Sequence, residues 1–138
     1  MAALERRVTS PIPTRWLTQM EGQLADAERR LASADRHLDA GSGGRALEEV
    51  YPGVMGAAMV KIWLGDEPWR TQRSLQEYQS MVRAELPSGF ATLFEMKQGQ
   101  RGFAGWRPED ARPLITEART FVHTVRTALE QCAPRPAN

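Results

Sequence analysis

The clearest pattern in the chain is a run of apolar residues that lie alternately three and four positions apart. Its members are Leu17, Met20, Leu24, Ala27, Leu31, Ala34 and Leu38. Charged residues occupy many of the positions between them, and the glycine-rich sequence GSGG follows at 41–44. Because this spacing places all seven side chains on one side of a helix, it predicts a long amphipathic helix from about Thr14 to Ala40.

A second apolar run follows the glycines and predicts a helix from about Arg45 to Leu64. Its buried side is expected to carry Leu47, Val50, Val54, Ala57 or Ala58, and Ile62. Small residues, notably Gly53 and Gly56, would let a neighbouring helix approach closely. Pro52 removes a backbone donor, so we expect it either to kink this helix or to split it in two.

The second half of the chain predicts two shorter helices and one long one. The first spans about 71–85, with an inward side made of Leu75, Tyr78, Met81 and Val82. A shorter segment from Phe90 to about Gln98 carries Phe90, Leu93, Phe94 and Met96. The glycine-rich stretch 99–106 is expected to be a loop.

The last helix is expected to begin at Pro108, because proline is common in the first turn and the acidic Glu109 and Asp110 favour a helix N-terminus. Its buried side would carry Ile115, Ala118, Val122, Val125 and Leu129. No stretch alternates as a strand does. The patterns therefore predict an all-α fold, an up-down four-helix bundle with a short additional helix. We expect a lead-in at 1–12, a bundle domain at 13–131 and a frayed tail at 132–138.

Composition and charge limit the number of domains, the ligands and the cellular location expected for such a bundle. The 138 residues suit one domain, and the formal net charge of +1 gives no long-range attraction to a polyanion, so RNA binding would need a local basic patch. The single cysteine, Cys132, cannot form an internal disulfide. The N-terminus lacks the apolar core of a signal peptide, and the longest nearly apolar run, VMGAAMV, is too short to span a bilayer. We expect a soluble, cytoplasmic protein with no membrane contact.

Four stretches together resemble the HEPN superfamily of small helical proteins. They are the long first helix, ALEEVYPGVMGAAMVKIWL, LPSGFATLFEMKQGQRGFAGW and RPEDARPLITEARTFVHTV, and they span roughly residues 14–130. The resemblance implies a helical bundle, often a homodimer packed through helix faces, and several members act beside a nucleotidyltransferase. The nuclease branch of the family carries an Arg and a His separated by four to six residues, which cleave RNA without metal at the dimer cleft.

Arg119 and His123 have only three intervening residues, one fewer than this minimum, and lie in the middle of the last helix. The other histidine, His37, directly follows Arg36 in the first helix. Arg101 lies where the resemblance would place the motif, but no histidine follows it for more than twenty residues. The nuclease motif is therefore degenerate, and a solvated or interface-edge strip is the favoured interpretation of Arg119 and His123. If the pair did act, His123 would transfer protons and Arg119 would stabilise the charge on phosphorus oxygens.

Tryptophan and arginine form two further candidate contact sites. They are Trp69 with Arg70 and Arg73, and Arg101 with Trp106 and Arg107. These residue types often anchor interfaces, but tryptophans near helix ends also plug the ends of bundles, which is the interpretation we favour. The sequence offers no metal-ligand set, no phosphate-binding loop and no nucleophile with an evident base, so no metal or cofactor is expected.

Three functions remain open from the sequence. The first is a non-catalytic HEPN-like module that dimerises and docks a separately encoded partner, such as a nucleotidyltransferase of a prokaryotic defence or toxin–antitoxin system. The second is a divergent metal-independent ribonuclease that uses Arg119 and His123. The third is a small binding bundle in which Trp63, Trp69 and Trp106 line one end and hold a nucleotide or another flat ligand.

Overall fold

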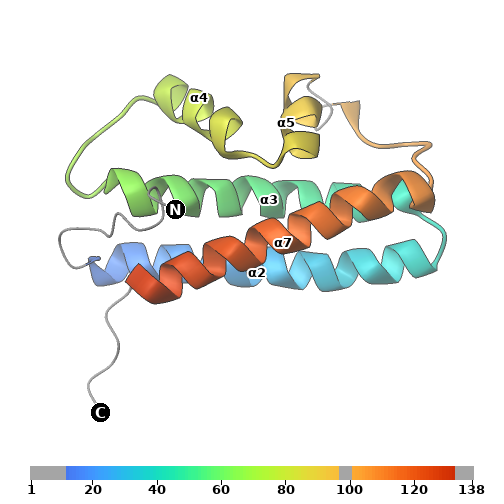
Figure 1. Ribbon diagram of the computed structural model, residues 1–138, viewed down its shortest axis with the longest axis horizontal. Helices are drawn as coiled ribbons and strands as arrows, with labels where there is room; N and C mark the ends of the chain where they lie inside the picture. Colours follow the sequence, from blue (N-terminus) through green and yellow to red (C-terminus); the bar gives the residue numbers. More distant parts are fainter. Residues whose placement is uncertain (1–11, 97–100, 133–138) are drawn as a thin grey trace, which may run out of the picture.

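The computed structural model describes residues 12–96 and 101–132, and these residues form an all-helical domain (Figure 1). The five helices are α2 (Thr14–Asp39), α3 (Gly43–Asp66), α4 (Leu75–Glu85), α5 (Ser88–Glu95) and α7 (Pro108–Cys132). No strand occurs within the described residues, so the predicted all-α class is confirmed. Most of the predicted lead-in and tail, residues 1–11 and 133–138, lies outside the described residues.

The three long helices pack side by side along their length (Figure 1). Helix α2 runs antiparallel to α7, since Asp35 pairs with Arg119 while Glu21, earlier in α2, pairs with Arg126. Helices α3 and α7 run in the same direction, because Gly43 at the start of α3 lies beside Arg107, just before α7. The segment that contains α4 and α5 lies over α3 and returns the chain to the start of α7.

The predicted apolar stripes of the long helices form the core. In α2, six of the seven predicted positions are buried, and Leu17 is partly buried. All predicted core positions of α3 and α7 are buried. The buried side chains shared among α2, α3 and α7 therefore supply most of the apolar burial that holds the fold together.

Two features of α3 were expected to matter for packing, and both are clear in the structure. Pro52 lies inside one continuous helix, so it does not split the element. A methyl group at Gly53 would lie only 3.1 Å from the Cα atom of Ala27, so α2 and α3 approach closely where α3 lacks a side chain. The helix begins at Gly43, two residues before the predicted start, because Gly43 and Gly44 let the loop of residues 103–107 pack directly on its backbone.

The prediction for the third helix was wrong at its start. Helix α4 begins at Leu75, and Ser74 caps it: the Ser74 hydroxyl accepts a hydrogen bond from the Glu77 amide, while the Glu77 carboxylate accepts one from the Ser74 amide. This reciprocal capping fixes the helix start. Leu75 was predicted to face inward but is 74% exposed, because the stripe meets the rest of the protein only from Tyr78 onward.

The fourth segment is also displaced from its predicted bounds. Helix α5 begins at Ser88, directly after Pro87, and ends at Glu95, whereas residues 97 and 98 lie outside the described residues. Phe90 and Leu93 are buried, but Met96 follows the helix and is 48% exposed. Helix α5 therefore attaches to the core through one face of about two turns.

Candidate functional site

Arg119 and His123 line a shallow groove between α2 and α7. The groove has a volume of about 310 Å³, and its walls are Glu28, Leu31, Ala32, Asp35, Arg119, Val122 and His123. Arg119 and His123 point to one side of the buried stripe because each directly follows one of its members, Ala118 or Val122, and successive residues lie about 100° apart around a helix. The sequence-based prediction that both residues lie at the edge of the core agrees with their exposure.

The Arg119 guanidinium is already bound to a carboxylate of the neighbouring helix. One of its nitrogens donates to both carboxylate oxygens of Asp35, at 2.9 Å each. The two side chains are 48% and 55% exposed, so the pair is hydrated and contributes little to stability. Its chemical consequence is larger, because the group that would hold a phosphate in a nuclease is occupied by an internal anion.

Two helical turns further along α7, Arg126 makes a denser set of contacts. Its guanidinium donates to both carboxylate oxygens of Glu28, at 3.0 and 2.9 Å, and to Glu21 at 2.5 Å. The two carboxylates hold the pKa of Arg126 above its ordinary value, chiefly through the hydrogen bonds to Glu28. The Arg126 side chain is only 19% exposed, so its contacts are less hydrated than those of Arg119.

These contacts predict different costs for removing the two arginines. Replacing Arg126 with methionine should lower the free energy of unfolding by about 1–2 kcal/mol, because two carboxylates lose charge-assisted hydrogen bonds. Replacing the half-exposed Arg119 with methionine should cost less than about 1 kcal/mol. Urea unfolding of both variants checks this order, and equal losses would show that Arg126 is not the stronger link between α2 and α7.

His123 lies between these two ion pairs along α7 and faces solvent. Among the described residues, none of the hydrogen bonds or ion pairs involves its imidazole. A general base is normally oriented by a hydrogen bond to its second ring nitrogen. The structure therefore brings Arg119 and His123 to one groove but does not hold the imidazole in a fixed orientation.

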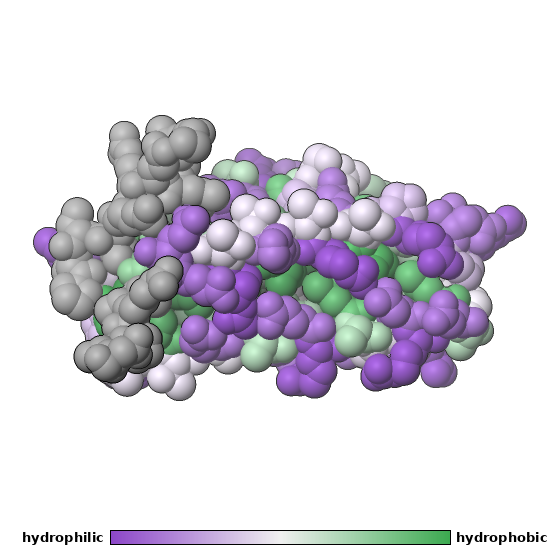
Figure 2. All heavy atoms as spheres, turned by 60° about the horizontal axis from the view of Figure 1, so that its bottom comes forward, coloured by the Kyte–Doolittle hydropathy of each residue, from purple (hydrophilic) through white to green (hydrophobic). Residues whose placement is uncertain are grey.

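The charge of the groove opposes anion binding. Three carboxylates, from Glu21, Glu28 and Asp35, face two guanidinium groups from Arg119 and Arg126. Figure 2 turns the α2 side of the molecule forward and shows hydrophilic residues over most of this face, with apolar residues visible in the gaps between them. A phosphate would have to displace Asp35 and approach two further carboxylates, which Coulomb repulsion disfavours.

The first tryptophan–arginine candidate proves to be a packed helix end. Trp69 lies 6.1 Å from Trp16, measured between ring centroids, and Trp16 packs edge-on against the buried Trp63 at 5.2 Å. Arg70 is ion-paired with Glu67, and Arg73 with Asp66. The aromatic rings thus close the bundle at the C-terminal end of α3, and the arginines pair with nearby carboxylates.

The second candidate lies at the opposite end of the bundle. Trp106 packs edge-on against the buried Phe103, with ring centroids 5.9 Å apart, beside the start of α3. Arg107 is exposed and approaches Glu109 at 3.7 Å, and Arg101 is exposed. The expectation that Trp63, Trp69 and Trp106 line one end of the bundle is therefore wrong, because a helix of 24 residues separates Trp106 from the other two.

An open pocket beside Trp106 has chemistry that does not suit a nucleotide. Its volume is about 670 Å³, and its walls are Ala104, Gly105, Trp106, Glu109, Asp110 and Pro113. The two carboxylates lie in the first turn of α7, where they complement the helix N-terminus. They would repel the phosphate groups of a nucleotide stacked on the tryptophan.

The sequence analysis did not identify the carboxylates that bind Arg119 and Arg126, nor the tryptophan that packs against Trp63 and Trp69. In the sequence, Asp35 and Glu28 are only two of the charged residues between the apolar positions of the first helix, yet they bind arginines 84 and 98 positions away. Trp16 was not singled out, although it joins Trp63 and Trp69 at the bundle end. Nothing local in the sequence marks these pairings. Only the antiparallel alignment of α2 and α7 could have suggested them.

Metal sites and membrane-spanning helices are two further features to consider in the part of the chain that the structure describes. Within residues 12–96 and 101–132, no three His, Cys, Asp or Glu side chains gather as a metal ion would require. In that same part of the chain, no helix combines the length and the apolar run needed to cross a bilayer. The chain matches no protein-family model, no curated protein and no solved structure.

Proposed function

We propose that the protein is a non-catalytic HEPN-like module that forms a homodimer and docks a separately encoded partner, such as a nucleotidyltransferase of a prokaryotic defence or toxin–antitoxin system. The helix order supports this proposal, since the four stretches that resemble the family fall on α2, on α3, on α5 with the residues that follow it, and on α7. In this proposal α4 and α5 together act as the third leg of an up-down four-helix bundle, broken at Leu86 and Pro87.

The ion pair between Arg119 and Asp35 carries the non-catalytic part of the proposal. A ribonuclease of this family would use an arginine to stabilise charge on phosphate, and here a carboxylate of the same chain occupies that arginine. The nearby His123 has no partner among the described residues that would orient it as a base. The groove therefore serves to join α2 to α7 through ion pairs.

An outward strip on α3 supplies an apolar helix face for the proposed dimer. Pro52, Met55 and Met59 lie three and four positions apart, so they share one side of the helix. Pro52 is exposed, and the two methionines are only partly buried against the core. Methionine is adaptable and enriched at protein interfaces, which suits a contact between two copies of the chain.

Light scattering coupled to gel filtration tests the dimer. The wild-type protein should have about twice the chain mass of 15.5 kDa. Changing Met55 and Met59 together to glutamate should yield a folded monomer, because each copy would bury two charges at the contact. The control, Gln76→Glu on the exposed side of α4, should remain a dimer. A wild-type protein that is strictly monomeric, or a dimer that survives the double change, would contradict the proposed interface.

The ribonuclease remains a second candidate, because Arg119 and His123 line the same groove. For that function a substrate phosphate would have to replace Asp35 on the Arg119 guanidinium. The half-exposed pair could be displaced, but the net charge of the groove opposes the exchange. A nucleotidyltransferase reading frame next to this one would favour the interaction module.

A further inference from the structure

Helix α4 is the least embedded of the helices in the described part of the chain. Val82 is its only buried side chain, whereas each of the three long helices buries six or more. Tyr78, Met81 and Glu85 are partly buried, and the other α4 residues face solvent. A segment with so few buried apolar contacts opens at a lower free energy than the whole domain.

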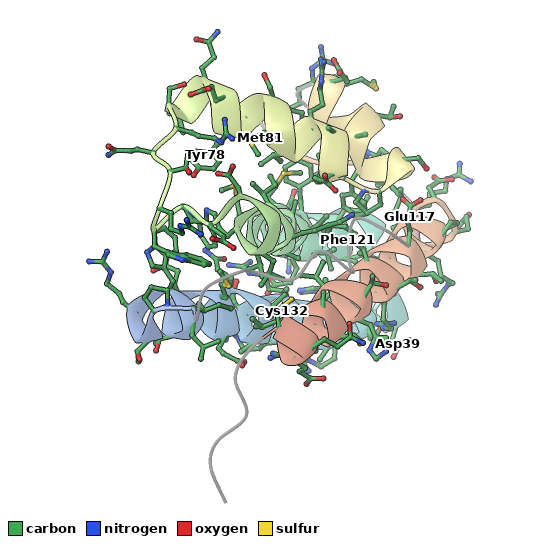
Figure 3. The ribbon with its side chains drawn as sticks, turned by 60° about the vertical axis from the view of Figure 1, so that its left-hand side comes forward. Asp39, Tyr78, Met81, Glu117, Phe121 and Cys132 are labelled. Atoms are coloured by element: carbon green, nitrogen blue, oxygen red, sulfur yellow. The ribbon has the colours of Figure 1, made fainter. Side chains whose placement is uncertain are left out.

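The space beneath α4 is incompletely filled. A pocket of about 360 Å³ lies between α4 and the C-terminal ends of α3 and α7. It is lined by Lys61, Ile62, Leu64, Gly65, Asp66, Met81, Ala84, Glu85, Ala128 and Cys132. In Figure 3, Met81 is labelled on α4 and Cys132 at the end of α7, with the end of α3 between these helices. The Cys132 thiol therefore lines a pocket that α4 partly covers.

Non-helical segments flank α4 on both sides. Residues 67–74 precede it, and the backbone at Leu86 and Pro87 is extended after it. Beyond that break, α5 is anchored by the buried Phe90 and Leu93. The Glu117 carboxylate of α7 also accepts hydrogen bonds from the Gly89 amide and the Ser88 hydroxyl, at 3.0 and 3.2 Å. These anchors and the buried Leu86 hold α5 and the break before it in place, so a pivot of α4 would lie at that break and in residues 67–74.

Polar contacts close α4 onto α3. Lys61 forms an ion pair with Glu85 at 2.8 Å, and both side chains are partly exposed. At the other end, the Asp66 carboxylate accepts hydrogen bonds from Arg73 at 2.7 Å and from the Tyr78 hydroxyl at 3.4 Å. The Lys61–Glu85 pair is in contact with water, so it is weak and is screened by salt, whereas the Asp66 side chain is only 7% exposed. The closure is therefore reversible, while the cap formed by Ser74 and Glu77 keeps α4 helical at its start.

We propose that α4 is a hinged flap, which swings away from α3 about residues 67–74 and the Leu86–Pro87 break. Once detached it frays, because a helix of 11 residues is marginal in water. Its opening widens the pocket beneath α4 and exposes the already partly exposed Cys132 more fully. Helices α2, α3, α5 and α7 stay in place during this motion. The flap thus controls access to one end of the bundle without unfolding the domain.

The rate at which a bulky maleimide labels Cys132 tests the flap, because Cys132 is the only cysteine in the chain. Val82→Ala should speed labelling by about tenfold by weakening the one buried anchor of α4. Glu85→Gln should speed labelling less, and 0.5 M NaCl should accelerate the wild-type protein more than this variant, because the variant has already lost the Lys61–Glu85 ion pair. The matched control, Ser80→Ala on the exposed side of α4, should label at the wild-type rate.

Hydrogen exchange of the same proteins separates the flap from two other causes of labelling. In Val82→Ala, amides of α4 should exchange faster, while those of α2, α3 and the last turn of α7 should be unchanged. Fraying of α7 would instead speed exchange in its last turn, and global unfolding would speed exchange in all helices. Labelling that responds to neither α4 variant, or α4 amides that exchange only together with those of α3, would overturn the proposal.

Discussion

Replacing Phe90 with alanine is expected to lower the free energy of unfolding by about 3–5 kcal/mol. Phe90 has no exposed surface, although it belongs to a helix of only eight residues. Its ring lies 6.3 Å from that of Tyr51 on α3, between centroids, so it connects α5 directly to the core. Truncation removes a large apolar side chain and leaves a cavity that the surrounding long helices cannot close. Urea unfolding followed by circular dichroism measures the loss.

Phe94→Ala is the matched comparison, because it makes the same truncation one turn later in α5. Phe94 is only partly buried, so we expect a loss of less than about 2 kcal/mol. The difference between the two variants reports which face of α5 meets the core. Equal losses, or a larger loss at Phe94, would show that α5 is rotated from the orientation described above.

The second large effect is expected at Gly43, at the start of α3. A methyl group there would overlap the backbone carbonyl of Arg107, and the carbonyl oxygen of Trp106 would lie 2.8 Å away. Both obstacles are backbone atoms, so a rotamer change cannot relieve the overlap. We expect Gly43→Ala to lower the free energy of unfolding by about 3 kcal/mol and to displace the loop that carries Trp106.

Gly22→Ala supplies the control for this substitution. Gly22 lies in α2, and no atom lies within 4 Å of the position that its methyl group would take. Because alanine favours the helix over glycine, this variant should be more stable by about 0.5–1 kcal/mol. Thermal unfolding compares the pair, and opposite signs are expected. A Gly43→Ala protein as stable as the wild type would show that the loop does not pack on α3 as described.

The long helices could be predicted from the sequence because each has a complete apolar stripe. The three–four spacing runs from Leu17 to Leu38 in α2 and from Ala111 to Leu129 in α7, so one buried side is specified by the sequence alone. The short helices have too few apolar positions to specify one buried side in this way. The start of α4 was misplaced even though Ser74 and Glu77 have the spacing of a capping box, a signal that was available and that outweighs the apolar Leu75.

The sequence predicted that the two residues of the candidate site lie together, but it did not predict which residues contact them. Arg119 and His123 share a face because they are four residues apart, which helix geometry guarantees. The groups that decide what Arg119 does come from α2, and their identity depends on how α2 and α7 align. The same holds for Trp69 and Trp106, whose separation to opposite ends follows from the direction of α3.

The ion pairs of the groove give both arginines a structural role. Asp35 and Glu28 neutralise the arginines that a nuclease would direct at phosphate, so these side chains link two helices. Asp35→Asn would remove one negative charge and release Arg119. This variant is therefore the one in which phosphate binding by the groove should first become detectable.

Cleavage of a fluorogenic RNA in EDTA, by the wild type and by His123→Ala, tests the central claim most directly. If the groove only joins α2 to α7 and does not cleave RNA, the two proteins should give the same background signal at equal concentration. Metal-independent cleavage by the wild type that is lost in both His123→Ala and Arg119→Ala, with each variant folded, would contradict the claim and establish the groove as a nuclease site.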